Sequence, residues 1–76
     1  MFVWLLTVTD DESGDIMRTD VHKTETGAIQ AAHKLAKEEG EVIEEDQHET
    51  DNEGLKHWHG ESDCACYDID RRELLD

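Results

Sequence analysis

The sequence predicts an α+β fold, a two-layer ββαββ sandwich in which one helix covers one face of an antiparallel or mixed four-stranded sheet. Three features predict it: a strand pair at the start of the chain, one amphipathic helix with clear end signals, and a second strand pair. The expected elements are residues 2–9, 16–23, 24–39, 55–60 and 64–70. The 76 residues suffice for a single small domain, 1–76, with a mobile acidic loop at about 41–54.

The first predicted hairpin is the most strand-like part of the chain. Residues Phe2–Thr9 are rich in β-branched and aromatic side chains, and the turn cluster Asp10–Asp15 contains Gly14. If Thr9 lies opposite Ile16, most of the large apolar side chains share one face. That face comprises Phe2, Trp4, Leu6, Val8, Met17, Thr19 and Val21. The opposite face comprises Val3, Leu5, Thr7, Ile16, Arg18, Asp20 and His22.

The predicted helix carries signals at both of its ends. Thr24 is a favourable N-cap with Glu25 in the first turn, and Gly40 suits the position just after the last turn. The apolar residues recur at helical spacing and are mostly small, so the helix is expected to lie close to the sheet. They are Ala28, Ile29, Ala32, Leu35 and Ala36.

The second predicted hairpin holds the residues with the most distinctive chemistry. Its core face is expected to consist of Trp58, Ala65, Tyr67 and Ile69. The other face carries His57, His59, Cys64 and Cys66. If His59 faces Cys64, then His57 faces Cys66, and the Cβ atoms of each pair lie about 4.5–5.5 Å apart. Two histidines and two cysteines suit tetrahedral zinc, so these four residues are the candidate metal ligands, and zinc is the candidate cofactor of a chain that is otherwise expected to have none.

A second interpretation of the same four residues stays open. The His-x-His and Cys-x-Cys spacings depart from those of common structural zinc sites, which place two or more residues between paired ligands. In a reducing cytoplasm both cysteines would stay reduced. All four residues would then be polar side chains on a solvated strand or at an interface, and the protein would have no cofactor.

The charge of the chain is its most unusual property. Asp and Glu number 21 against 7 Lys and Arg, which gives a net charge of −14, and residues 38–53 are acidic without one Lys or Arg. Such a chain repels itself in low salt, whereas molar salt shortens the Debye length to about 3 Å. With few lysines and few large apolar side chains, the sequence resembles small acidic α+β proteins of haloarchaea or of their viruses. That resemblance implies a halophilic cytoplasm or a virion as the location.

The sequence argues against an enzyme. It contains no nucleophile elbow and no phosphate-binding loop, and its acidity disfavours direct binding to nucleic acid. No run of about 18 apolar residues predicts a membrane span, and no secretory signal is recognised at the N-terminus. We expect a small halophilic accessory protein that acts without catalysis through protein–protein contacts. Two alternatives are a zinc-binding mini-domain and an acidic nucleic-acid mimic that inhibits a DNA- or RNA-binding enzyme.

One helix can cover only one face of a sheet, so the other face of the predicted sheet is left open. Under the register above, this open face carries Val3, Leu5 and Ile16 beside the histidines and cysteines. Small domains often need further apolar burial to be stable. We therefore expect a homodimer joined through this face or through a strand edge, with Leu74 and Leu75 packed against the edge of the core.

Overall fold

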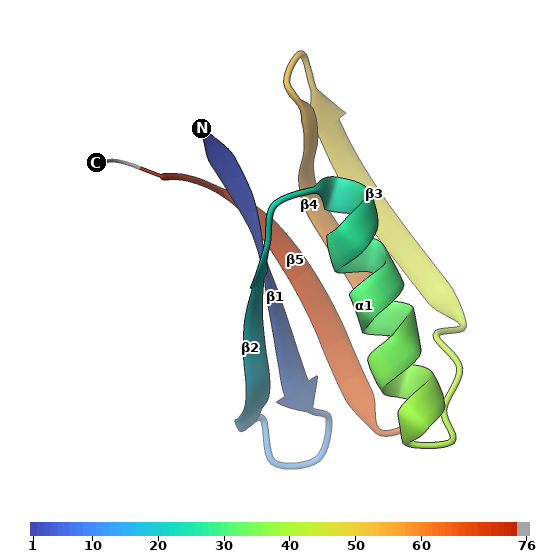
Figure 1. Cartoon of the computed structure of the whole chain (residues 1–76). Coiled ribbons are helices and arrows are strands. Elements are labelled where there is room, and N and C mark those ends of the chain that lie inside the picture. Colours follow the sequence, from blue (N-terminus) through green and yellow to red (C-terminus); the bar gives the residue numbers. More distant parts are fainter. Residues whose placement is uncertain (75–76) are drawn as a thin grey trace.

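The computed structural model describes residues 1–74, the side chain of Glu45 excepted. Within these residues the elements are β1 (Phe2–Asp10), β2 (Ile16–His22), α1 (Glu25–Glu38), β3 (Glu45–Asp51), β4 (Gly54–Glu61) and β5 (Ala65–Glu73). The strands form one antiparallel sheet of order β2-β1-β5-β4-β3, and α1 lies across one of its faces (Figure 1). The predicted α+β class with one helix is confirmed, whereas the predicted four-stranded ββαββ arrangement is wrong because the described chain forms a fifth strand, β3.

The ends of α1 lie where the local signals predict them. The Thr24 hydroxyl accepts a hydrogen bond from the Gly27 N–H at 3.0 Å and caps the first turn. At the other end Gly40 adopts a φ of +74°, and the Glu41 N–H turns back to donate to the Ala36 carbonyl at 2.8 Å. This is a Schellman ending, in which a left-handed glycine lets the chain leave the helix with its last carbonyls satisfied.

The core lies between α1 and the helix-facing side of the sheet. Its buried residues are Leu6, Val8, Ala28, Ala32, Ala36, Leu55, Trp58, Ala65, Tyr67 and Ile69. The helix contributes only alanines to this set, so it can lie close above the large rings of Trp58 and Tyr67, and the predicted core face of the second hairpin is confirmed. Leu74 is half-exposed rather than packed, and Leu75 lies outside the described residues.

The start of β4 is anchored to two other elements by hydrogen bonds. The indole N–H of Trp4, on β1, donates to the Leu55 carbonyl at 2.9 Å. The Leu55 N–H in turn donates to a carboxylate oxygen of Glu25 at 2.7 Å. Glu25 therefore places a negative charge in the first turn of α1, and its hydrogen bond to β4 also fixes that turn over the sheet.

A β-bulge in the β1–β2 pair changes which side chains of β2 face the helix. Thr9 lies opposite Ile16 as predicted, but Met17 is then an extra residue in the ladder. A one-residue slip moves the rest of the strand to the other face, so Val21 pairs with Leu5 on the side away from the helix. The predicted faces of β2 are therefore wrong beyond the bulge. The open side carries Ile16, Thr19 and Val21, and the helix side carries Arg18, Asp20 and His22.

The acidic segment 41–54 contains a strand, which corrects the prediction of a mobile loop throughout. The strand β3 pairs with β4 at the edge of the sheet. Two side-chain contacts hold it: Arg71 of β5 donates to both carboxylate oxygens of Asp51, and the Trp58 indole N–H donates to Asp46 at 3.3 Å. Both contacts bring together residues that are far apart in the sequence. An edge strand lined with carboxylates also discourages pairing with another chain.

Candidate functional site

The sheet face away from α1 is open, and its β1–β2 side contains no charged residue. Directly opposed residues of an antiparallel pair point to the same face, so the strand pairing identifies the members of this surface. They are Val3, Leu5, Thr7, Thr9, Ile16, Thr19 and Val21, and we call them the uncharged half. In a chain in which 37% of residues are charged, seven neighbouring uncharged positions form a distinct surface.

The other side of the same face carries alternating histidines and carboxylates on β4 and β5. His57 lies opposite Asp70, and His59 lies opposite Asp68. The Nδ1 atom of His57 lies 2.7 Å from Asp70 Oδ1, and that of His59 lies 2.6 Å from Asp68 Oδ1. Each of these four side chains is about one-third exposed. With Glu61 and Cys66 they form what we call the ionic half.

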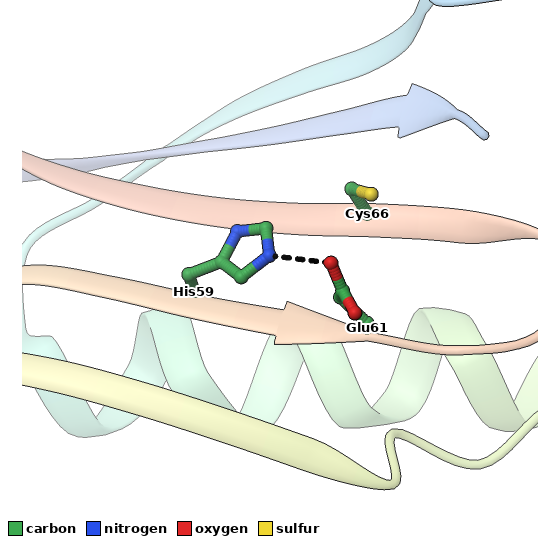
Figure 2. Close-up of side chains that lie close together, drawn as sticks. All are labelled: His59, Glu61 and Cys66. Atoms are coloured by element: carbon green, nitrogen blue, oxygen red, sulfur yellow. Dashed lines mark hydrogen bonds and ion pairs between the residues drawn. The ribbon is translucent and has the colours of Figure 1, made fainter.

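Three potential metal ligands of different chemistry lie together in the ionic half: His59, Glu61 and Cys66 (Figure 2). Glu61 lies opposite Cys66 across the two strands, and His59 Nε2 lies 3.1 Å from a Glu61 carboxylate oxygen. One ligand atom from each residue lies within 4.8 Å of the other two. The hydrogen bond to Asp68 raises the pKa of His59 above its ordinary value. The cluster thus combines a nitrogen, an oxygen and a sulfur donor at a partly exposed position.

The structure brings together only some of the residues predicted to bind metal. The predicted pairing of His59 with Cys64 and of His57 with Cys66 is wrong, because the hairpin turn lies two residues later than expected. It consists of Asp63 and Cys64 and is closed by a hydrogen bond from the N–H of residue 62 to the carbonyl of residue 65 at 2.9 Å. Moving the turn by two residues shifts each cross-strand partner by four, and an even shift preserves the faces, so His57, His59 and Cys66 still share the open side. Cys64 lies in the turn and does not join them.

Sequence reasoning missed the acidic members of the ionic half. Glu61, Asp68 and Asp70 alternate with the core residues of their strands, at the same spacing as the histidines and Cys66. That two-residue alternation was the available signal, because every second residue of a strand points to the same side. The acidic excess of the whole chain concealed it.

Neither cysteine is activated as a nucleophile. The carboxylate of Glu41, through a side-chain hydrogen bond and its charge, raises the pKa of Cys64 to about 11. Burial, followed by the negative charge of Asp11, raises the pKa of Cys66. Reactive thiols have a lowered pKa and an electropositive surrounding, and these two have neither. Both are free thiols rather than a disulfide.

Two grooves flank the helix on the other side of the sheet. One, of about 410 Å³, is lined by Val8, Leu35 and Tyr67 together with three glutamates near the end of α1. The second, of about 330 Å³, lies between α1 and β2 and is lined in part by His22. The Nε2 atom of His22 is buried and has no hydrogen-bond partner among the described residues. The bulge turns His22 toward the helix and so buries this nitrogen without a hydrogen bond.

Comparison with protein-family models, with curated proteins and with solved structures gives no match for this chain. Over the described residues 1–74, no helix has the length and apolar character needed to cross a membrane.

Proposed function

We propose that this chain is a non-catalytic interaction protein that associates with a second copy of itself through the uncharged half of its open face. The observation that carries the proposal is the segregation of charge on that face. Charged side chains make up 37% of the chain, yet none lies among the seven members of the uncharged half. Two of those members, Ile16 and Val21, are 67% and 63% exposed.

Electrostatics favours this surface for contact between two copies. Each chain carries a net charge of −14, so most other contacts between copies would place carboxylates against carboxylates. A two-fold symmetric contact places the same patch of both chains against itself, which for the uncharged half brings no like charges together. Burial of its exposed apolar area stabilises the contact by about 25 cal/mol per Å² before the cost of association is subtracted.

A role without catalysis is supported by the state of the ionisable groups. No polar or charged residue among those described is fully buried, and both thiols have raised pKa values. Perturbed acids and bases in enclosed pockets are typical of enzyme sites. The charged groups of the open face are instead partly solvated and paired with one another.

The acidic composition adds a requirement for salt. Repulsion between two chains of charge −14 opposes dimerisation at low ionic strength, and this repulsion is screened when the Debye length becomes short. We therefore propose that the protein works in a concentrated salt environment, as the composition of haloarchaeal proteins and of their viruses suggests. Dimerisation should strengthen as potassium chloride rises from roughly 0.05 M to 3 M.

The test compares two substitutions of the same kind at two exposed valines. Val21→Asp adds a charge to the uncharged half, whereas Val42→Asp adds the same charge after the end of α1, where the valine is 71% exposed. Light scattering at tens of micromolar protein in high salt should find wild type and Val42→Asp dimeric and Val21→Asp monomeric. A wild-type mass of 8.7 kDa, or equal behaviour of the two variants, would overturn the proposal.

A further inference from the structure

The ionic half of the open face holds donor atoms that the proposed dimer contact does not use. Figure 2 shows His59 and Glu61 on one strand and Cys66 on the next, all on the same side of the sheet. One ligand atom from each lies within 4.8 Å of the other two. Around a tetrahedral zinc ion, ligand atoms lie about 3.3–3.8 Å apart, as follows from bond lengths of about 2.0–2.3 Å. Closing the cluster around an ion therefore requires side-chain rotation, for which the partial exposure of His59 and Cys66 and the greater exposure of Glu61 leave room.

The backbone under these three residues is held on both sides. The strand β4 lies between β3 and β5, and β5 lies between β4 and β1, so neither is an edge strand. Sites built on such elements hold their ligands more accurately than sites on loops. The Cα positions of the cluster are therefore set by the sheet itself.

His59 is already oriented as a metal-binding histidine would be. Its Nδ1 atom is hydrogen-bonded to Asp68 Oδ1 at 2.6 Å, which leaves Nε2 to point toward Glu61. Histidines that bind metal almost always have their second nitrogen bonded to a carboxylate or a carbonyl, which fixes the orientation of the ring. Asp68 therefore acts as a positioning residue for His59.

We propose that His59, Glu61 and Cys66 bind one zinc ion, with Asp68 positioning His59 and a water molecule completing the coordination. Nitrogen, carboxylate oxygen and thiolate sulfur are all ordinary zinc ligands, and the thiolate disfavours magnesium and calcium. On binding, the Cys66 S–H bond breaks, the proton passes to solvent and a zinc–sulfur bond forms, with no transfer of electrons. The site contains two of the four ligands that the sequence predicts, and Glu61 takes the place of the other two.

The two residues that the site excludes provide matched controls. Cys64 lies in the hairpin turn, where it interacts with Glu41 rather than with the cluster. His57 is engaged on the same face by Asp70, at 2.7 Å. Cys66→Ser can therefore be compared with Cys64→Ser, and His59→Gln with His57→Gln.

The experiment is a titration of the full chain with zinc by calorimetry, and with cobalt by absorption spectroscopy. We expect one ion per chain and a thiolate-to-cobalt band. Cys66→Ser should abolish that band, and His59→Gln should lower the affinity for zinc by roughly tenfold or more. The control variants Cys64→Ser and His57→Gln should keep the wild-type band and the wild-type affinity. Absence of the band in wild type, or equal losses within each matched pair, would overturn the proposal. Circular dichroism without metal checks that each variant is folded, and native mass spectrometry of the wild type gives a stoichiometry that is independent of the variants.

The positioning role of Asp68 has a separate readout. Asp68→Asn should lower affinity for zinc by about 10- to 100-fold, yet at saturation it should show the same cobalt–thiolate band as wild type. Loss of the band in this variant would mean that Asp68 is itself a ligand or that the cluster has collapsed, and either result contradicts the assigned role.

Two further measurements separate this site from its surroundings. An excess of magnesium displaces an ion held only by exposed carboxylates but not one held by a thiolate, so displacement of cobalt by magnesium would overturn the proposal. The monomeric Val21→Asp variant should still bind one zinc ion per chain. With cobalt it should show the same thiolate-to-cobalt band as wild type. Failure of the dimer and failure of the metal site can therefore be told apart.

Discussion

The two halves of the open face differ in the chemistry of their side chains, although they belong to the same sheet. Along both halves the outward residues alternate with residues that face the same core. On β1 and β2 the outward side chains are Val, Leu, Ile and Thr, and on β4 and β5 they are His, Asp, Glu and Cys, with Arg72 at one end. The helix-facing sides of β1, β4 and β5 instead resemble one another, since all bury apolar residues under α1. The strand β1 is therefore apolar on both sides for much of its length, whereas β4 and β5 are apolar only on the side that faces the helix.

Because of this difference, removing the two halves from water has opposite effects on the free energy. Partly exposed valine, leucine and isoleucine side chains gain about 25 cal/mol for each Å² that is later covered, so the uncharged half gains from a partner. The paired histidines and carboxylates of the ionic half already satisfy one another while they stay hydrated. Covering them would remove that hydration, whereas a metal ion would use their lone pairs.

The largest effect on the stability of the fold should come from the core, which lies on the other side of the sheet from the two halves. Trp58 is 2% exposed and is one of the largest buried side chains, so Trp58→Ala should destabilise the fold by about 3–5 kcal/mol. Urea unfolding followed by far-UV circular dichroism measures this loss. His33→Ala, which removes an exposed ring that lies 5.9 Å from that of Trp58, is the control and should cost well under 1 kcal/mol. Similar stability of the two variants would contradict the placement of Trp58 in the core.

A smaller effect should come from moving the boundary between the halves. Thr7 of the uncharged half lies directly opposite Asp68 of the ionic half. Thr7→Asp sets two carboxylates across from each other and should destabilise the chain by about 0.2–1 kcal/mol, whereas Thr7→Lys should be neutral or stabilising.

Both Thr7 variants should nevertheless weaken the dimer, because either sign of charge interrupts the uncharged half. Thermal unfolding at low protein concentration measures the stability of the chain, and light scattering at high concentration measures dimerisation. A variant that keeps the wild-type dimer despite its new charge would mean that the contact lies elsewhere.

The smallest effect concerns the ion pair that joins β3 to β5 outside both halves. The Arg71 guanidinium, through its hydrogen bonds, holds the pKa of Asp51 well below its ordinary value. A carboxylate whose folded pKa is lowered contributes stability above its unfolded pKa of 3.8, and this contribution is lost as the pH falls toward the folded pKa.

Asp51→Asn should therefore lower the melting temperature by a few degrees at pH 7, and the difference from wild type should shrink below about pH 4. Melts between neutral pH and pH 2 test this, with Glu49→Gln on the same strand as a control of equal charge change. A difference that is constant with pH would show that the pair does not stabilise β3 through its charge.

The helix and the sides of the second hairpin could be predicted because their causes are local. Thr24 and Gly40 act on backbone groups within a few residues of themselves, and the alternation around Trp58 and Tyr67 places their side chains on one face in any register shifted by two. The candidate site was only half predicted. Its partners depend on the register, and the register depends on a turn whose position differed from the predicted one by two residues.

The sequence by itself determined the α+β class, the span of the helix, the stripe of small residues that packs on the sheet, and the acidic charge. The tertiary structure alone decided three further points: the bulge at Met17, the turn at Cys64 and the strand β3. The strand β3 is held by contacts between distant residues, since Arg71 pairs with Asp51 and Trp58 with Asp46. Period and propensity act over a few neighbours, whereas a strand or a register is stable only when the rest of the sheet is present to pair with it.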